Sequence, residues 1–322
     1  MIERFGGYCR LRQYLVALAA TLLLAGCAPQ LPTVMPGEVV ETLPEPAVIP
    51  HGEGRIWQVD YPGQEPSYLF GTLHVTNPSV FDLPEAAETA FAGAKFAAFE
   101  SELRADVTEE EKELYMELPA DVRLFDIVGE ETYRRMKALF LFRYFNVEGL
   151  DRLQPWVVWS LIAGREISID IRSEEGRLIL DDWLQERAAK EGKQVVHLET
   201  PAEQMLVFAG MPMEDQLSML RSAIDGYGET QVKVEHVQLY LQGKLAVRYA
   251  LWQRFLGHME PTVAQSFNER MVSGRNRSMT EDLLPAFARG STFVAVGAMH
   301  MPGEDGILRL LEQRGYTVTW LQ

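Results

Sequence analysis

Two stretches of sequence decide the fold: SYLFGTLHV at residues 67–75 and STFVAVGAMH at residues 291–300. Each contains an apolar run rich in β-branched and aromatic residues, which predicts a buried strand. Each also contains the same four-residue pattern, Gly-x-x-His, at residues 71–74 and 297–300. Because glycine lacks a Cβ atom, it lets the chain turn or lets another group approach the backbone closely. The repeated pattern therefore predicts two strands that each place a histidine near their carboxyl end.

A helix and a further strand follow each of these strands. Apolar residues at helical spacing and short apolar runs predict both elements in both places. The predicted elements are helices over residues 83–94 and 304–314 and strands over residues 95–100 and 316–321. A third segment repeats half of this pattern, with a helix over 178–190 and a strand over 194–199. Because such successions favour parallel strands with helices packed on them, the sequence predicts an α/β fold whose mixed sheet is built from two related strand-GxxH-helix-strand units.

The middle of the chain has a largely helical pattern. Residues 107–165 and 202–258 carry apolar residues at helical spacing and few strong helix breakers. We expect these segments to form a large helical insertion that covers the sheet. Sheet and insertion together are predicted to form one domain over residues 51–322.

The composition is that of an ordinary globular protein and excludes several functional classes. Hydrophobic residues make up 47% and charged residues 24% of the 322 residues, which excludes a disordered chain, a collagen and a disulfide scaffold. Thirty Lys and Arg against 46 Asp and Glu give a net charge of −16. Because general nucleic-acid binding needs a basic surface, we expect no nucleic-acid partner.

The N-terminal segment has the pattern of a targeting sequence. Three arginines precede an apolar run at residues 14–25, YLVALAATLLLA. This run is shorter than the about 20 apolar residues of a membrane-spanning helix. It ends in Leu-Ala-Gly-Cys at residues 24–27, which resembles a bacterial lipobox. Residues 1–26 are therefore predicted to be a lipoprotein signal peptide, with a plain signal peptide or a membrane anchor as the alternatives.

A lipobox has consequences for the anchor and for the cysteines. Cys27 would carry the lipid that attaches the protein to the bacterial cell envelope, and Ala28 favours the outer membrane, facing the periplasm. Residues 27–50 contain six of the 17 prolines, a density that blocks helix and sheet and favours an extended tether. Since Cys9 is the other cysteine, the mature chain would have no thiol for catalysis, metal binding or a disulfide.

His74 and His300 are the first candidates for chemistry. Each follows a predicted strand, and ligands of open α/β sheets bind at the carboxyl ends of the strands. Glu100 ends the strand over 95–100, so its carboxylate points into the same cleft or is solvated. Two neutral imidazoles and a carboxylate suit a divalent metal such as Mn, Co, Zn or Fe and leave positions open for water. The alternative, on spacing alone, is that both histidines are satisfied core or edge residues.

Three further polar residues are candidates for the same site. Glu199 ends the strand over 194–199 and is a candidate metal ligand, general base or partner that orients a ligand histidine. Arg275 and Asn276 begin the polar stretch RNRSM and would supply a cation or an amide to a substrate. The alternative is a solvated helix start. The sequence has no HExxH, GxSxG, GxGxxG or Walker A motif, so the mechanisms of those motifs are not indicated.

Five blocks of sequence together resemble a known family. They are YLFGTLHV, KFAAFE, KQVVHLETPAEQ, RNRSM and FVAVGAMHMPGEDGILRLLEQRGYTV, in that order within residues 55–322. The blocks resemble the TraB/GumN family, which also includes PrgY and the animal Tiki proteins. The resemblance implies a fold like those of the erythromycin esterase and ChaN proteins. It also implies a functional core formed by the residues of the two Gly-x-x-His motifs and the glutamate after the first: Gly71, His74, Glu100, Gly297 and His300. Arg275 and Asn276 match the family's Arg-Asn block, and Glu199 and Gln204 match its Leu-Glu-Thr…Gln block.

The resemblance also implies a chemistry. Tiki proteins are similar in these motifs and act as metal-dependent proteases, which implies a metallohydrolase that cleaves a peptide or protein substrate. One divalent metal ion is then expected, with His74, Glu100 and His300 as its ligands. Glu199 is expected to act as the general base, and Arg275 or Asn276 to stabilise the oxyanion. Two alternatives stay open, a haem- or iron-binding lipoprotein like ChaN and a metal-free hydrolase in which a histidine is the general base.

Overall fold

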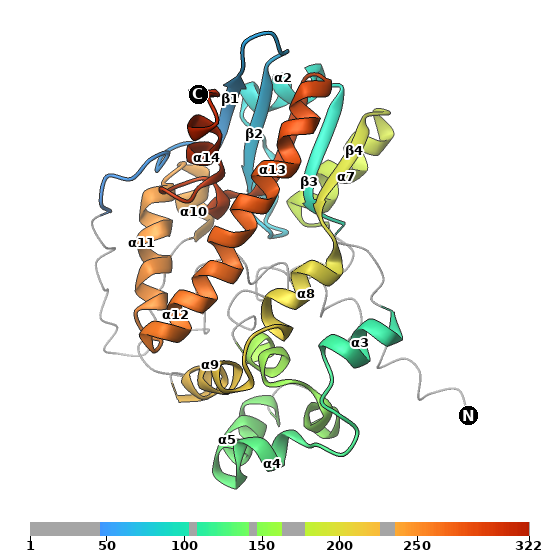
Figure 1. Ribbon diagram of the computed structural model, residues 1–322, viewed down its shortest axis with the longest axis vertical. Coiled ribbons are helices and arrows are strands. Elements are labelled where there is room, and N and C mark those ends of the chain that lie inside the picture. The colour runs from blue at the N-terminus through green and yellow to red at the C-terminus, as the bar shows by residue number, and fades with distance from the viewer. Residues whose placement is uncertain (1–45, 103–107, 142–146, 163–177, 226–235, 322) are drawn as a thin grey trace.

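A computed structural model describes residues 46–102, 108–141, 147–162, 178–225 and 236–321 (Figure 1). The predicted signal peptide, the lipobox and most of the predicted tether lie outside the described residues. The described part is an α/β fold with one mixed sheet of six strands and many helices. No helix in it is long and apolar enough to cross a membrane.

The six strands follow an order in the sheet that differs from their order in the chain. Across the sheet they are β4 (Gln194–Glu199), β3 (Phe96–Ser101), β5 (Thr292–Gly297), β2 (Ser67–Thr72), β1 (Ile56–Asp60) and β6 (Thr317–Leu321). β1 is antiparallel to both of its neighbours, and the other neighbouring pairs are parallel. The five other strands therefore run in one direction and end at the same edge of the sheet.

Burial explains which strands the sequence revealed. All six residues of β3 and of β5 are buried, so these strands are nearly continuous apolar runs, as expected for strands covered on both faces. The predicted strands β4 and β6, at the two edges, also lie close to their expected positions. β1 was not predicted, because its five residues, IWQVD, are too few to show a clear period.

The connections after β2 and β5 cross each other. The first passes through η1 (Pro78–Phe81) and α2 (Glu85–Gly93) to β3, on the far side of β5. The second passes through η4 (Ala298–His300) and α14 (Ile307–Gln313) to β6, on the far side of β2. Since such crossovers are right-handed, opposite directions place α2 and α14 on opposite faces of the sheet. Ligands of α/β sheets bind where adjacent parallel strands send their connections to opposite faces of the sheet, which here is between β2 and β5.

The remaining helices belong mostly to the middle of the chain. They are α3 (Glu109–Tyr115), α4 (Leu124–Val128), α5 (Glu130–Leu141), η2 (Val147–Arg152), a helix over 155–162, α7 (Leu180–Lys190), α8 (Pro201–Ala209), α9 (Met213–Asp225), α10 (His236–Leu241), α11 (Leu245–Leu256), α12 (Pro261–Asn268), the π-helix η3 (Glu269–Ser273) and α13 (Gly274–Arg289).

The helical middle covers the sheet only in part: Tyr240 of α10 and Leu245 of α11 pack in the core of the sheet, but most of the other middle helices do not. Figure 1 shows α3, α4, α5, α8 and α9 beyond one end of the sheet, whereas α13 crosses its near face. The middle helices pack around a core of their own. In this core the ring of Phe208 contacts those of Trp156 and Phe267, and the ring of Phe267 also contacts that of Trp159. The core of the sheet is separate and includes side chains of α2, α7, α10, α11, α13 and α14. The carboxyl ends of the parallel strands thus face a helical layer.

Candidate functional site

His74 lies two residues beyond β2 and is fixed by a carboxylate. Its Nδ1 atom is 2.8 Å from Oδ2 of Asp181, at the start of α7. Oδ1 of Asp181 accepts a hydrogen bond of 2.5 Å from the hydroxyl of Thr72. The Nε2 atom of His74 is buried without a hydrogen-bond partner and lies 3.8 Å from Oε2 of Glu100. The ring therefore directs Nε2, which makes no hydrogen bond, towards Glu100.

His300 lies in η4, directly after β5, and is fixed by an amide. Its Nδ1 donates to Oδ1 of Asn276 at 2.5 Å. The amide of Asn276 is oriented by its own Nδ2, which donates to the backbone oxygen of Asp305 at 2.7 Å. Because Oδ1 can only accept, Nδ1 of His300 carries the proton and Nε2 carries the lone pair. This Nε2 atom is 3.9 Å from Oε2 of Glu100.

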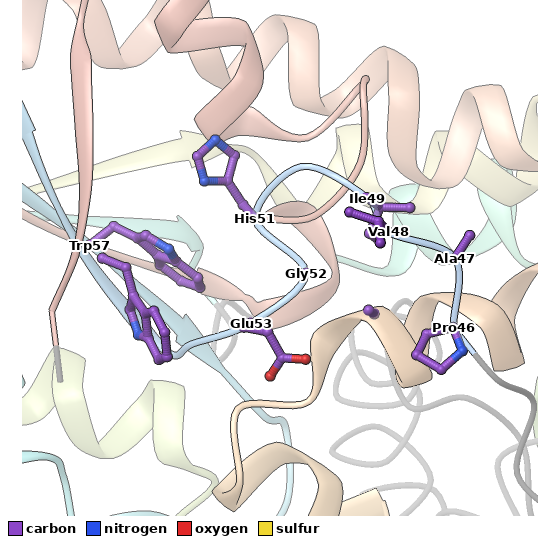
Figure 2. A pocket seen from close by; sticks show the side chains of 10 residues that line it. Pro46, Ala47, Val48, Ile49, His51, Gly52, Glu53 and Trp57 are labelled. Carbon is purple, nitrogen blue, oxygen red and sulfur yellow. The ribbon is translucent and has the colours of Figure 1, made fainter.

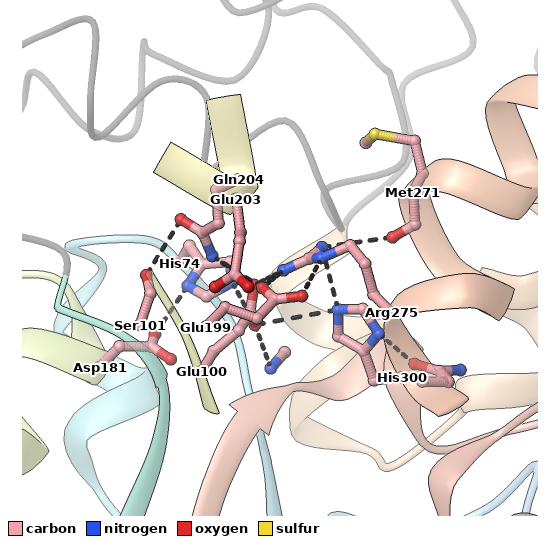
Figure 3. A network of polar contacts seen from close by, with 12 residues as sticks. His74, Glu100, Ser101, Asp181, Glu199, Glu203, Gln204, Met271, Arg275 and His300 are labelled. Atoms are coloured by element: carbon pink, nitrogen blue, oxygen red, sulfur yellow. Dashed lines mark hydrogen bonds and ion pairs between the residues drawn. The ribbon is translucent and has the colours of Figure 1, made fainter. Parts of the chain in front are cut away.

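Glu100 lies at the centre of the site, where side chains from several elements contact its carboxylate (Figure 3). Both histidine Nε2 atoms approach its Oε2 atom, which also accepts a hydrogen bond of 3.1 Å from the backbone amide of Gly297. Its Oε1 atom accepts from Nη2 of Arg275 at 2.6 Å and from the amide of Gln204 at 3.2 Å. The structure thus brings together the three residues predicted to hold a metal.

Arg275 joins the two glutamates of the site. Its Nε donates to Oε1 of Glu199 at 2.7 Å and its Nη2 to Oε2 of Glu199 at 2.5 Å. Its Nη1 donates to the backbone oxygen of Met271 at 3.2 Å and lies 3.4 Å from Nε2 of His300. Arg275 and Asn276 are buried in the first turn of α13, so they do not form a solvated helix start. All the predicted polar site residues therefore belong to one buried network.

The charges of the two histidines differ. Burial lowers the pKa of His74, but the carboxylates of Asp181 and Glu100 raise it, with a result of about 9. Burial also lowers the pKa of His300, and although Glu100 raises it, Arg275 and His74 lower it further, to about 3. Burial raises the pKa of Glu100, but Arg275 and both histidines outweigh this effect and lower it to about 2. In the metal-free protein near pH 7, Glu100 is therefore ionised, His74 is protonated and His300 is neutral, so a metal ion would have to displace the proton on Nε2 of His74.

The motif glycine of β2 permits a close approach and not a turn. A Cβ atom at Gly71 would lie 3.0 Å from both Cα and Cβ of Ala298. Neither Gly71 nor Gly297 has a positive φ; φ of Gly297 is −50°. The absent side chain therefore lets the segment after β5 lie directly against β2, so that the two histidines share one site.

The sequence-based prediction missed Asp181 and Thr72. Asp181 lies on the buried side of α7, close to Leu184 and Ala188, which pack in the core of the sheet. A carboxylate at that position of an apolar helix face was the available signal, since a buried carboxylate needs a partner. The partner, His74, lies 107 residues away in the chain and could not be identified from spacing.

A cavity elsewhere in the molecule is separate from this network. Its volume is about 390 Å³ and it lies beneath the segment from Pro46 to Glu53, beside Trp57 and Trp320 (Figure 2). Its lining includes none of the predicted site residues. The segment above it is held to the domain, since the amide of Gly303 donates to the backbone oxygen of Pro50 at 2.9 Å.

Comparison with known proteins assigns the fold and the network to a family. The model of the TraB/PrgY/gumN family matches residues 55–320, which contain the whole network and all six strands except the last residue of β6. The chain belongs to the TraB/PrgY/gumN family. No solved structure matches this family member.

Several curated relatives of this TraB/PrgY/gumN family member are distant. It is similar to Metalloprotease TIKI2 of Danio rerio (25% identity over 313 residues, 82% of this chain and 60% of the relative). It is also similar to Metalloprotease TIKI1 of Xenopus tropicalis (24% over 302 residues, 79% and 59%) and to the Metalloprotease TIKI homolog of Amphimedon queenslandica (23% over 313 residues, 83% and 61%). The chain spans about 60% of the length of these relatives.

The named relatives imply a metal, and the network fits one in the chemistry of its donors. Two imidazole nitrogens and a carboxylate oxygen are suitable ligands, and the buried Nε2 of His74 lacks a hydrogen-bond partner. In the described part of the chain, however, no group of three or more His, Cys, Asp and Glu side chains is arranged to hold a metal ion. The guanidinium of Arg275 contacts Glu100 instead, so a metal would have to share this carboxylate with Arg275.

Proposed function

We propose that this family member is a metal-dependent hydrolase that cleaves a peptide or protein substrate. The observation that carries the proposal is the convergence of Nε2 of His74 and Nε2 of His300 on one oxygen of Glu100, at 3.8 and 3.9 Å. Each ring is fixed through its other nitrogen, as is usual for histidines that ligate metals. The distant similarity to the Tiki metalloproteases supports the same chemistry.

His74, His300 and Glu100 would hold one divalent metal ion, of which Mn, Co, Zn and Fe suit the donors. When bound, such an ion supplies a Lewis acid that lowers the pKa of water and polarises a carbonyl group. The chain itself prepares the ligands. Arg275 holds Oε1 of Glu100, which leaves Oε2 directed at the histidines.

The other polar residues are proposed to position this group. Both oxygens of Glu199 accept hydrogen bonds from Arg275, so we assign Glu199 the task of holding Arg275 in preference to that of general base. Asn276 uses both ends of its amide, on His300 and on Asp305. These engaged groups favour a positioning role for Arg275 and Asn276 over a role at the oxyanion.

The test is the metal content of the purified full chain, measured by mass spectrometry after exposure to Mn, Co, Zn and Fe. We expect one ion per chain in the wild type and none in the His74→Ala/His300→Ala double variant. The matched control is His197→Ala, because this exposed histidine of β4 contacts Gln185 and lies outside the network. Full metal content in the double variant would contradict the proposal.

A metal-free hydrolase is the second candidate. The observation that favours it is the contact of Arg275 with Glu100 in place of a closed ligand set. It predicts peptidase or esterase activity that survives exhaustive chelation, whereas the first proposal predicts that activity is lost on chelation and restored by one metal. A Soret band after addition of haem, lost in His74→Ala, would instead indicate the haem-binding alternative.

We also propose that the protein is attached by lipid on Cys27 to the bacterial outer membrane, facing the periplasm. The support is the basic, apolar and Leu-Ala-Gly-Cys succession that ends at Cys27. Metabolic labelling with palmitate should label the wild type and not Cys27→Ala. Equal labelling of both proteins would contradict the anchor.

A further inference from the structure

Asp181 is a buried carboxylate to which the predicted mechanism assigns no task. It lies in the first turn of α7 and is 2% exposed. Both of its oxygens are engaged, Oδ1 by Thr72 at 2.5 Å and Oδ2 by His74 at 2.8 Å. The carboxylate cannot rotate without losing one of these contacts, so the ring of His74 has a single orientation.

Rigid elements hold this contact from both sides. α7 packs against β3 and β4 and buries Leu184 and Ala188 in the core of the sheet, while Thr72 is the last residue of β2. The amino end of a helix favours a carboxylate, but removal of a carboxylate from water costs free energy unless it is paired. An uncharged pair of similar volume would often pack as stably. A charge at this position therefore points to a task beyond packing.

We propose that Asp181 is a positioning residue that fixes Nδ1 of His74 and thereby raises the affinity of the site for a divalent cation. This inference rests on the proposed function. A carboxylate on the far nitrogen of a ligand histidine sets the ring orientation and makes the ligand more basic. The nitrogen that this arrangement presents is the buried Nε2 of His74, which has no hydrogen-bond partner and faces Glu100.

The test compares three variants of the full chain in their affinity for Co²⁺, measured by competition with a chromogenic chelator. Asp181→Asn keeps the shape and an acceptor oxygen but removes the charge, and Asp181→Ala removes both. The control is Glu186→Gln, because Glu186 lies on the same helix with 38% of its side chain exposed, 3.3 Å from Lys190. We expect an affinity lower by about 10–100-fold in Asp181→Asn, at least as low in Asp181→Ala, and unchanged in Glu186→Gln.

A structural role alone would move the unfolding midpoint and leave the affinity of the folded protein unchanged. Unfolding curves of each variant therefore accompany the titrations, and Asp181→Asn decides the question if Asp181→Ala fails to fold. Wild-type affinity for Co²⁺ in folded Asp181→Asn would overturn the inference.

Failure of the proposed function gives a different result, namely no binding of Co²⁺ by the wild type. The proposed effect on cation affinity is then overturned as well, and the fixing of Nδ1 of His74 by Asp181 is decided separately by nuclear magnetic resonance of the ring. A slowly exchanging Nδ1 proton in the wild type that is lost in Asp181→Ala supports it. Rapid exchange of this proton in the wild type overturns it.

Discussion

His74 and His300 occupy equivalent places, yet their surroundings are opposite in charge. They follow two adjacent parallel strands, β2 and β5, whose register pairs Thr72 with Gly297. A carboxylate holds Nδ1 of His74, whereas an amide holds Nδ1 of His300. The pKa of His74 is raised to about 9 and that of His300 is lowered to about 3. The motif therefore determines where each ring lies, and a residue from a distant segment determines its charge.

The difference in charge between the two histidines stabilises the buried carboxylate of Glu100 in the metal-free protein. His74 and Arg275 together place two positive charges beside Glu100, and the neutral His300 adds none. A second protonated imidazole at the same carboxylate would be repelled by both. The unequal partners thus let two copies of one motif share a single buried glutamate.

The largest expected effect on stability comes from replacing Arg275, whose guanidinium donates a hydrogen bond to Glu100 and lies beside His300. Arg275→Leu leaves Glu100 and Glu199 buried without their ion-pair partner, which should lower the free energy of unfolding by about 3–5 kcal/mol. Urea unfolding measures the loss. Arg277→Leu is the control, because Arg277 is 49% exposed in its pair with Glu269 and should lose at most about 1 kcal/mol. Equal losses in both variants would refute the central role of Arg275.

Exchange of the two Nδ1 partners tests whether they cause the asymmetry. Asn276→Asp should raise the pKa of His300, and Asp181→Asn should lower the pKa of His74, because a carboxylate stabilises the protonated ring and an amide does so less. Asn276→Asp also loses the donation to Asp305, at an expected cost of about 1–3 kcal/mol in stability. Titration by nuclear magnetic resonance gives both pKa values. Unchanged values would mean that burial alone separates the two rings.

The pH dependence of stability should have opposite signs for the two histidines in the metal-free protein. The pKa of His74 is above its ordinary 6.5, so its contribution is full below pH 6.5 and is lost as pH rises towards 9. The pKa of His300 is below 6.5, so its contribution is full above pH 6.5 and is lost as pH falls towards 3. Unfolding midpoints of His74→Gln and wild type should therefore converge above pH 9. A difference that stays constant from pH 6 to pH 10 would contradict this sign.

The smallest effect concerns the close packing that brings the two motifs together. Gly71→Ala places a methyl group 3.0 Å from Ala298, which should lower stability by about 1 kcal/mol. Gly93→Ala is the control, because a Cβ atom there meets nothing within 4 Å, and it should leave stability unchanged or raise it. Thermal unfolding compares the two variants. Stability equal to wild type in Gly71→Ala would show that β2 and the segment after β5 can separate at no cost.

Much of the fold and of the site follows from local patterns. β3 and β5 were predicted because they are mostly apolar runs. The candidate site was predicted because parallel strands end at the same edge of the sheet, which brings together the two motif histidines and the glutamate of β3. The separate core of most of the helical middle was not predicted. Amphipathic spacing shows that one face of a helix is buried, but it does not show which element packs against that face. Asp181 was missed for the same reason, since its contact with His74 spans 107 residues.

The late position of β5 in the chain has a consequence for folding. β5 separates β3 from β2 in the sheet, and the amide of Gly297 reaches Glu100 across 197 residues. Until residue 297 is available, β4 with β3 and β2 with β1 are two unjoined ribbons with open apolar edges, which favour aggregation. Contacts this distant in sequence also make folding slow. The chain therefore has a long interval during its synthesis in which it must be kept from pairing with other chains, and the two histidines meet only when that interval ends.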